Sequence, residues 1–475
     1  PNINATLKIN TLKLDNWLTG IEQNNDFSIS SRELPDYLGS IDINFGVIEY
    51  NDEIINRASV KGQFQNNKFE IERAQAFLPG GSNIRVMGKA DFKDQGNPKF
   101  NGEFRLSGNN LRELLNWSGI DLRNVPIGQL TNFAIETGLK IEGNAFNFIR
   151  AKGHLDITKF NGDARIRLGG RTNYAINLGL SRLNLDNYFP IKAKTEVKKN
   201  WSEIQSEYDD AFSPLKSFDG TFKIKSQQVI IKNALLKDFK IDATLTRGKL
   251  TLKTFSSSDA VGIKTHVSGT LEVGAKTPRL DLEVDLELGS IEKILKWTKI
   301  TTKADPFELG VITAKGRIAT DLRRLTLNLE GQGVFGTYKT SGKIEGLSED
   351  PESFDLAILF SHSDHTNLLK NLKIEIPFGA LGSPLSINAS ANGSFRKFDG
   401  VIDAQVMGGV VHLEGFAEDV LNTPKVNMAV SISHSDLVKA AQIFNINLTP
   451  SVKKIGGLKL NGNFKDNIFV QEIID

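Results

Sequence analysis

The sequence predicts a mainly β protein: a long, curled, predominantly antiparallel sheet, shaped as a groove and built from repeats of several strands, each closed by a short amphipathic helix. Three observations predict it. In RLDLEVDLELGSIEKILKW (279–297), leucine and valine first alternate with aspartate and glutamate, which is the period of a strand with one apolar face. After the Gly-Ser pair the apolar residues recur at helical spacing. The same switch then recurs along the chain.

Six segments share this strand-to-helix plan, which predicts six short helices. They are LKINTLKLDNWL (7–18), FRLSGNNLRELLNW (104–117), INLGLSRLNLDNYF (176–189), residues 279–297, LAILFSHSDHTNLLKNL (356–372) and MAVSISHSDLVKAAQIF (428–444). A small polar residue at the switch predicts a helix N-cap, because its side chain accepts from first-turn amides. The predicted caps are Asn110, Ser290, Asp364 and Asp436, and Asn110 with Glu113 resembles a capping box.

Short alternating segments punctuated by Gly, Asn or Asp lie between these helices and predict antiparallel hairpins. They occupy 58–92, 138–170, 221–273, 314–346 and 385–419. Together the two patterns predict one continuous elongated domain with these parts: 1–20, the tail of a preceding repeat; 21–120, 121–190, 218–300, 301–373 and 374–448, each a β repeat plus helix; 191–217, an insertion or hinge with a helix over 194–212; and 449–475, the start of a further repeat.

Composition excludes several classes of function. The 58 basic and 56 acidic residues nearly cancel, so no global field favours nucleic acid. The absence of cysteine excludes disulfides, thiolate metal sites and cysteine nucleophiles. No apolar run reaches the roughly 18 residues that a membrane-spanning helix needs. The chain starts and stops within the repeat pattern, so we expect a fragment whose targeting and anchoring parts lie outside it.

The predicted apolar face is too large for the short helices to cover. Open sheets of more than about ten strands curl or split, so the face is covered by the sheet itself or by an apolar ligand. The alternation selects these candidate lining residues: Ile84, Val86, Leu178, Leu180, Val284, Leu286, Leu356, Ile358, Val426 and Met428.

Two motifs have both a chemical and a structural interpretation. Gly331, Gly333 and Gly336 form a G-x-G-x-x-G pattern, but a strand-like segment follows it, which favours a hairpin turn over a nucleotide loop. The SHSDH segment offers two histidines and Asp364 as zinc ligands. Because SHSD recurs at 433–436 at the same junction, helix capping is the favoured interpretation. The zinc candidates are His362, Asp364 and His365.

Charged and aromatic residues also recur in pattern. The alternating acids Asp281, Glu283, Asp285 and Glu287 suggest a calcium cluster or, as favoured here, the polar face of one strand, with Lys249 or Lys253 opposite. Large aromatic residues follow four of the strand-to-helix switches. They serve as rim anchors or, as favoured here, as plugs at the strand ends. These residues are Trp17, Trp117, Tyr188 and Trp297, while Trp201 lies in the insertion.

The strand and turn cadence resembles the AsmA family of bacterial envelope proteins. The resemblance is carried by SRLNLDNYFP (181–190), by FDGTFKIKSQQVIIKNALLKDFKIDATLTRGKLTLKTF (218–255), and by LPGG (78–81) with its weaker echoes LGG (168–170) and MGG (407–409). It implies a periplasmic protein, anchored in the inner membrane, with an apolar groove for phospholipid transport. It implies no catalytic residues.

These observations lead to a non-catalytic envelope protein whose apolar β-groove binds or conducts phospholipids or other acyl lipids between inner and outer membranes and supports outer-membrane integrity. We expect no cofactor, no metal and no nucleic acid. The expected partners are the two membranes, reached through regions outside this chain, and envelope proteins. The alternative is a self-packed scaffold or outer-membrane protein assembly factor without lipid transport, and a surface adhesin is a further, weaker alternative. No nucleophile is paired with a base, so an enzyme is not expected.

Overall fold

The computed structural model describes residues 2–18, 38–94, 97–189, 206, 212–273, 277–298, 310–321, 323–346, 352–366, 368, 382–394, 396–419, 425–443, 456–465 and 468–472. It divides into two compact units, unit 1 (Pro1–Gly248) and unit 2 (Lys249–Asp475). Strands dominate the described part of both units. The predicted insertion helix over 194–212, with Trp201, lies almost wholly outside the described residues, as does the side chain of Trp17.

Unit 1 consists of strands with short helical turns between some of them. The strands are β1 (Asn2–Lys13), β2 (Leu38–Tyr50), β3 (Glu53–Gln65), β4 (Lys68–Leu78), β5 (Ser82–Asp91), β6 (Lys99–Gly108), β7 (Phe133–Glu142), β8 (Ala145–Leu155), β9 (Thr158–Arg167), β10 (Asn173–Asn184), β11 (Asp219–Ile231) and β12 (Ala234–Thr246). The helices are α1 (Asp15–Leu18), α2 (Leu111–Trp117) and the 3-10 turns η1 (Leu185–Asn187) and η2 (Ser213–Lys216).

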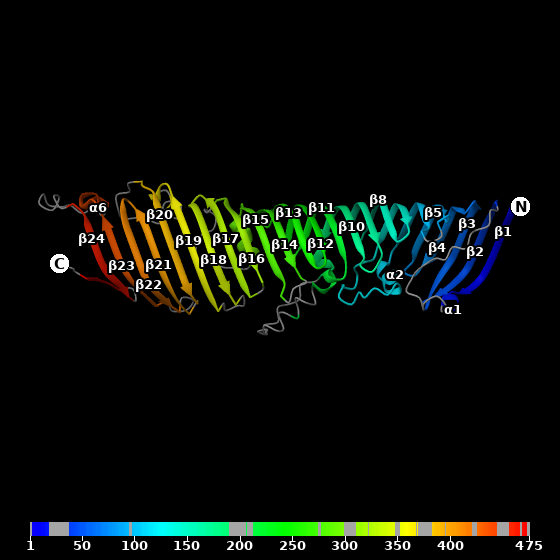
Figure 1. Ribbon diagram of the computed structural model, residues 1–475, viewed down its shortest axis with the longest axis horizontal. Coiled ribbons are helices and arrows are strands. Elements are labelled where there is room, and N and C mark those ends of the chain that lie inside the picture. The colour runs from blue at the N-terminus through cyan, green and yellow to red at the C-terminus, as the bar shows by residue number, and fades with distance from the viewer. Residues whose placement is uncertain are drawn as a thin grey trace. The chain divides into compact units, whose positions relative to one another are not determined.

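Each strand of unit 1 pairs with the next along the chain, so the strands run from blue to green in sequence order in Figure 1. Most of these pairs are antiparallel hairpins. Two are parallel, β1 with β2 and β10 with β11. A parallel pair requires the chain to return to the opposite end of the sheet. In both cases the returning segment begins with a helical turn, α1 or η1.

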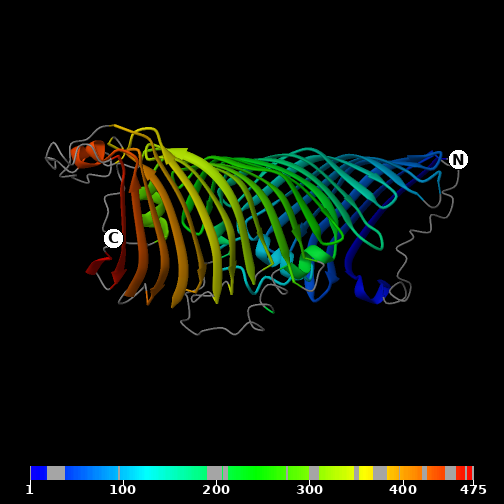
Figure 2. The same ribbon diagram turned by 60° about the vertical axis from the view of Figure 1, so that its left-hand side comes forward.

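Unit 2 contains strands that pair antiparallel with their sequence neighbours. They are β13 (Lys249–Ala260), β14 (Ile263–Glu272), β15 (Arg279–Leu288), β16 (Ile312–Thr320), β17 (Arg324–Gly333), β18 (Gly336–Glu345), β19 (Ser353–His362), β20 (Leu385–Gly393), β21 (Lys397–Val406), β22 (Gly409–Glu418), β23 (Lys425–His434), β24 (Leu458–Lys465) and β25 (Ile468–Glu472). Helix α4 (Ile291–Thr298) follows β15 and helix α6 (Leu437–Ile443) follows β23. In Figure 2 the yellow and orange strands of this unit are bowed along their length.

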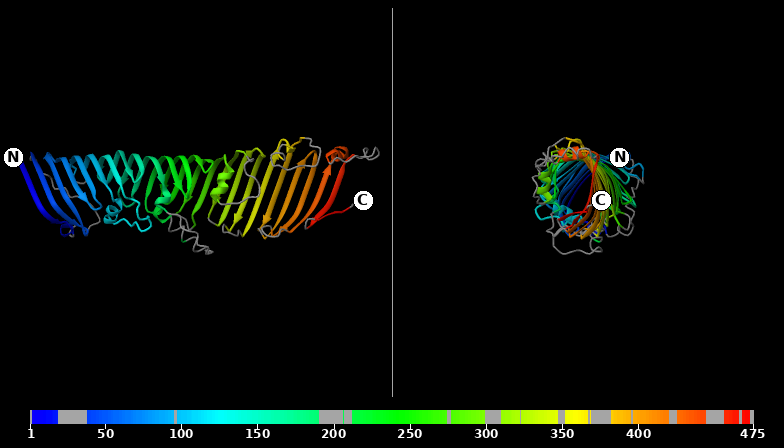
Figure 3. Two further views of the ribbon diagram at one scale, coloured as in Figure 1. Left: turned by 180° about the vertical axis from the view of Figure 1, so that it is seen from behind. Right: turned by 90° about the vertical axis from the view of Figure 1, so that its left-hand side faces the viewer.

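The predicted fold class is therefore confirmed: mainly β, predominantly antiparallel, with short helices at the ends of certain strands. Helices α1, α2, α4 and α6 lie at the predicted positions, and Figure 3 shows α1 and α2 at the strand ends of unit 1. The switch at 181–190 yields only the 3-10 turn η1. The helix predicted within 356–372 is described only as far as 366 and at 368.

Candidate functional site

The strand register of unit 2 brings the predicted lining residues onto one face. Residues directly opposite each other on paired strands project from the same side of a sheet. One row crosses ten strands, β14 to β23: Val267, Val284, Gly316, Leu329, Thr340, Ile358, Ala389, Ile402, Leu413 and Val430. Leu286, Leu356, Val426 and Met428 lie two or four positions from this row along their strands, which places them on the same face.

Unit 1 has a corresponding face. A row crosses β5 to β10: Ile84, Leu106, Ile135, Gly153, Phe160 and Leu180. Val86 and Leu178 are each two positions from this row, so all four candidates of unit 1 share one face. We call this surface, in either unit, the apolar face, and the opposite surface the polar face.

Most of the candidate lining side chains on the apolar face are half-exposed. Among the ten candidates only Val284 is buried, at 7 % exposure, whereas Ile358 is 42 % exposed. If a second layer of protein packed on this face, the side chains of the face would be buried. Among the residues that the structure describes, the candidate side chains are therefore shielded by their neighbours on the sheet but not covered by a packed layer.

No side chain in these two rows, or at the candidate positions beside them, carries a formal charge. Hydroxyl groups on the face are turned back to the backbone. Thr137 donates to the carbonyl oxygens of Gly138 at 2.9 Å and Ile149 at 3.2 Å, and Tyr338 donates to the carbonyl of Thr313 at 2.8 Å. Burial raises the pKa of the Tyr338 phenol, which stays protonated. The face thus offers its surroundings mainly hydrocarbon.

Phenylalanine rings pack over glycines on this face. The ring of Phe100 covers both Gly102 on its own strand and Gly88 on β5, and the ring of Phe160 covers Gly153 on β8. A Cβ atom added at Gly88, Gly102 or Gly153 would overlap the ring that lies above it. This packing is the aromatic rescue of glycine in a sheet, and it places apolar ring carbons over positions that have no side chain.

Basic side chains on the adjacent strands β14 and β16 form ion pairs with acids on the polar face of β15. Arg317 on β16 binds Asp281 at 2.6 Å, and Lys315 binds Asp285 at 2.9 Å. The hydrogen bonds from Arg317 lower the pKa of Asp281. Lys264 on β14 reaches Glu287 at 3.3 Å. The acids therefore form a polar strand face, as predicted.

The predicted partners of these acids were wrong. Lys249 binds Glu272 at 2.6 Å, and both Lys249 and Lys253 lie on β13, which pairs with β14 and not with β15. The alternation identifies the face of a residue, but it does not identify the neighbouring strand.

The four predicted N-caps are confirmed. Main-chain amides donate to Asn110 Oδ1 (3.2 Å), Ser290 Oγ (3.4 Å), Asp364 Oδ1 (2.9 Å) and Asp436 Oδ1 (3.0 and 3.1 Å). The amides of Lys439 and Val438 lower the pKa of Asp436. The Asn110–Glu113 pair differs from a capping box in one respect, because Glu113 accepts from the side-chain amide of Asn110 at 2.9 Å.

Histidines of the two SHSD segments take part in the same junction. His362 Nδ1 accepts from the amide of Asp364 at 2.9 Å, and His434 Nδ1 accepts from the amide of Asp436 at 3.0 Å. His434 Nε2 then donates to the carbonyl of Met407 at 3.0 Å. In the described residues no three metal-binding side chains converge. Both segments therefore cap helices, the favoured interpretation.

The glycine motif is a hairpin. Strand β17 ends at Gly333 and pairs with β18, which begins at Gly336, so no helix follows the loop. Gly336 has a φ of +126°, a value that side chains other than hydrogen rarely adopt. The preference for a turn over a nucleotide loop is confirmed.

The aromatic residues at the switches differ in their surroundings. Trp117 is half-buried, donates from Nε1 to the carbonyl of Tyr50 at 3.1 Å and stacks edge-on against the Tyr50 ring at 5.9 Å. Tyr188 donates to Asp156 at 2.9 Å, whereas Trp297 is 45 % exposed. Trp117 matches the predicted plug.

Two aspartates that sequence reasoning missed hold the parallel crossovers. Asp186 accepts from the amides of Lys232 and Asn233, at 2.6 and 2.8 Å, in the β11–β12 turn. Asp15 accepts from the amide of Asn51 in the β2–β3 turn at 3.2 Å from either oxygen. The available signal was the repeated LDN-aromatic sequence, LDNW at 14–17 and LDNY at 185–188.

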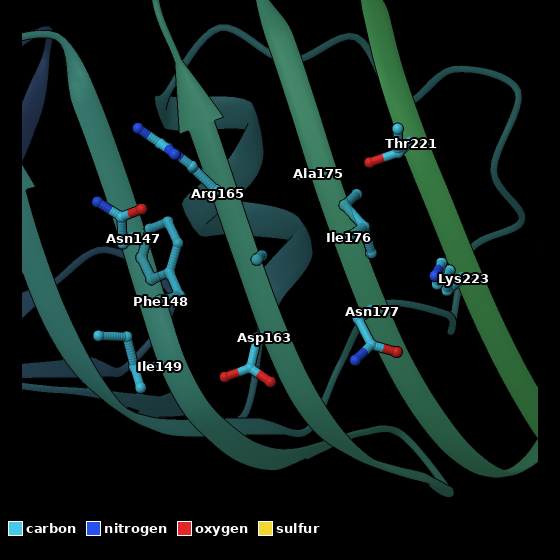
Figure 4. Close-up of a pocket in the computed structure, with 11 residues that line it drawn as sticks. Asn147, Phe148, Ile149, Asp163, Arg165, Ala175, Ile176, Asn177, Thr221 and Lys223 are labelled. Atoms are coloured by element: carbon cyan, nitrogen blue, oxygen red, sulfur yellow. The ribbon is translucent and has the colours of Figure 1, made fainter. Parts of the chain in front are cut away.

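A shallow hollow of about 290 Å³ lies on unit 1 across β8 to β11 (Figure 4). Asn147, Arg165, Ala175 and Thr221 form one row of the polar face there, and Ala175 leaves space between larger neighbours. Asp163 at its edge accepts from the amide of Arg150 at 2.9 Å. The hollow mixes charges of both signs and contains no converging set of ligands.

Among the parts of the chain that the structure describes, no helix has the length and apolar character needed to traverse a bilayer. Comparison of the chain with family models, with curated proteins and with solved structures finds no match.

Proposed function

We propose that this protein binds acyl lipids, phospholipids first among them, along its apolar faces and conducts them between the inner and outer membranes of a cell envelope. The observation that supports the proposal is the apolar face itself, continuous over ten strands of unit 2, half-exposed and free of charge along the rows traced. Large uncovered apolar surfaces in proteins usually mark interaction sites.

An acyl chain suits such a face for energetic reasons. Transfer of each methylene from water to an apolar surface gains about 0.8 kcal/mol. The lining consists of aliphatic side chains, phenyl rings and a few hydroxyl groups and has no charged side chain along the rows traced, so no single position is strongly preferred, which favours movement along the face. The resemblance of 181–190 and 218–255 to the AsmA family supports a periplasmic location and a non-catalytic role.

The experiment uses two adjacent residues on opposite faces of β19. Ile358 on the apolar face is 42 % exposed and Leu359 on the polar face is 47 % exposed. Lipids that co-purify with the gently extracted protein are measured by mass spectrometry in the wild type, in Ile358→Glu and in the matched control Leu359→Glu.

We expect the wild type and Leu359→Glu to carry the same amount of phospholipid, and Ile358→Glu to carry less of it with unchanged circular dichroism. A charge on the apolar face costs desolvation on lipid binding, whereas the same charge on the polar face remains in water. A folded, lipid-free wild type, or equal loss in both variants, would refute the proposal. The first result would favour the self-packed scaffold or assembly factor.

A further inference from the structure

The three most exposed large apolar side chains in the described residues belong to segments that meet at one place in unit 1. They are Ile127 at 96 % exposure, Phe189 at 71 % and Ile157 at 69 %. We call this set the apolar tip. Its members belong to three segments far apart in sequence: the loop after α2, the end of the η1 turn and the β8–β9 turn.

One carboxylate fixes these three segments together. Asp156 accepts from the amide of Leu130 at 3.1 Å, from the amide of Thr131 at 2.9 Å and from the hydroxyl of Tyr188 at 2.9 Å. A polar pocket of about 220 Å³ lies between the segments, and its lining includes Gly128, Ile157 and Tyr188. The side chains of the apolar tip therefore project from a connected base.

The carboxylates around the apolar tip are engaged within the protein. Asp121 binds Arg123 at 2.7 Å, Asp186 accepts from two amides of the β11–β12 turn, and Asp156 holds the base. Lys159, two residues beyond Ile157, is exposed. Because these acids have partners within the protein, they repel the phosphate groups of a lipid surface less than free carboxylates would.

The apolar tip is also continuous with the apolar face. A row at the end of this face runs through Gly108, Phe133, Leu155 and Thr158, on strands β6 to β9. The β8–β9 turn that carries Ile157 joins the last two of these strands. A lipid could pass between a bilayer at the tip and the apolar face without crossing a row of charged side chains.

We propose that the apolar tip inserts into the surface of a phospholipid bilayer and docks unit 1 there. The transfer of lipid from the bilayer to the apolar face rests on the proposed function. The docking itself requires only the three exposed side chains of the apolar tip. A single side chain buried in the interfacial region gives weak adhesion, whereas three on one connected base act together.

The test measures flotation of the full chain with vesicles of phosphatidylethanolamine and phosphatidylglycerol. The variant combines Ile127→Ser, Ile157→Ser and Phe189→Ser. Its matched control combines Leu38→Ser, Phe77→Ser and Leu168→Ser, three residues of unit 1 outside the tip that are 40–47 % exposed. We expect vesicle binding to fall by at least roughly tenfold in the tip variant, since one buried large apolar side chain is worth about that factor, and to remain unchanged in the control.

A second readout uses fluorescence. Tryptophan emission of Ile127→Trp should shift to shorter wavelength when vesicles are added, and that of Leu168→Trp should not. Equal binding by the tip variant and the wild type, or no vesicle binding by the wild type, would overturn the inference. Lipid mass spectrometry on the same preparations separates the two proposals, because a lipid-free wild type that still binds vesicles through its tip would refute only the proposed function.

Discussion

Asp156 shows how one side chain sets the geometry of a surface. Burial alone would raise the pKa of its carboxyl, but hydrogen bonds from Thr131, Tyr188 and Leu130 outweigh that effect, and the pKa lies below the ordinary 3.8. Burial of the Tyr188 phenol and its hydrogen bond to Asp156 raise the pKa of that phenol above the ordinary 10.0. The bond therefore joins a carboxylate to a protonated phenol throughout the neutral range.

This arrangement predicts an acid-sensitive base for the apolar tip. A carboxyl with a lowered native pKa contributes stability above its unfolded pKa, and that stability is lost as the pH falls through the native value. We expect the melting temperature of the wild type to fall, relative to that of Asp156→Asn, below a pH of about 4, near the ordinary pKa of aspartate. At pH 7, Asp156→Asn should be less stable by about 1–3 kcal/mol.

The measurement is a series of thermal melts between pH 2.5 and 7, a range below the pKa of the phenol. Tyr188→Phe is the control, because it removes one hydrogen bond and keeps the carboxylate. It should retain a smaller acid-dependent loss. Parallel pH profiles for the wild type and Asp156→Asn would contradict the prediction.

At the scale of single elements, the junctions were predictable and the crossovers were not. A cap such as Asp436 is decided by residues within one turn of it, so local sequence is sufficient. Whether β10 pairs parallel or antiparallel with β11 depends on where the chain returns, and an alternating pattern is the same in either orientation. The partner of Asp281 was missed for a related reason, since Arg317 lies 36 residues away in sequence and reaches Asp281 diagonally across the β15–β16 pair.

The face on which each candidate lining residue lies could be predicted, because it depends on the position of the residue along its own strand and not on the neighbouring strands. Ile358 and Leu359 differ by one position, and a period of two assigns them to opposite sides whatever the neighbouring strands are. The apolar tip could not be foreseen from the same pattern. Ile127 and Phe189 follow a helix and a 3-10 turn, where no period links sequence to exposure, and only the contacts of Asp156 bring them together.

The two LDN-aromatic turns predict a local effect on the crossovers. Asp186 binds two amides of a turn whose residues Lys232 and Asn233 have φ values of +49° and +61°. Left-handed backbone in residues other than glycine is uncommon and needs support from its surroundings. We expect Asp186→Ala to destabilise this region by about 0.5–1.5 kcal/mol, because two main-chain amides lose their hydrogen bonds to a charged acceptor.

Hydrogen exchange measures this effect directly. The amides of Lys232 and Asn233 should exchange faster in Asp186→Ala, while amides of β14 in unit 2 remain unchanged. Asp399→Ala, at an exposed position of β21, is the control and should leave both regions as they are. Unchanged protection of the β11–β12 turn in Asp186→Ala would show that the turn holds without its acceptor.

At the scale of the whole molecule, the composition follows from a sheet with two unlike faces. Only 39 % of the residues are hydrophobic, and 24 % are charged, because one side of nearly every strand meets water. A sheet that packed both sides into a core would need near-continuous apolar strands. The apolar faces that result are large enough to cause association between molecules unless something covers them.

If acyl lipids cover these faces, each unit should bind its own share. Leu178→Glu in unit 1 and Ile358→Glu in unit 2 place a charge on each apolar face, and Asn177→Glu and Leu359→Glu are their adjacent polar-face controls. Native mass spectrometry counts the lipids bound per chain. Each apolar-face variant should lose part of the lipid, and the controls should match the wild type. If the two units bind lipid independently, the two losses should add in the double variant. Complete loss of lipid from either single variant would instead mean that lipid binding to one unit depends on lipid binding to the other, as expected if lipid enters the protein at one end only.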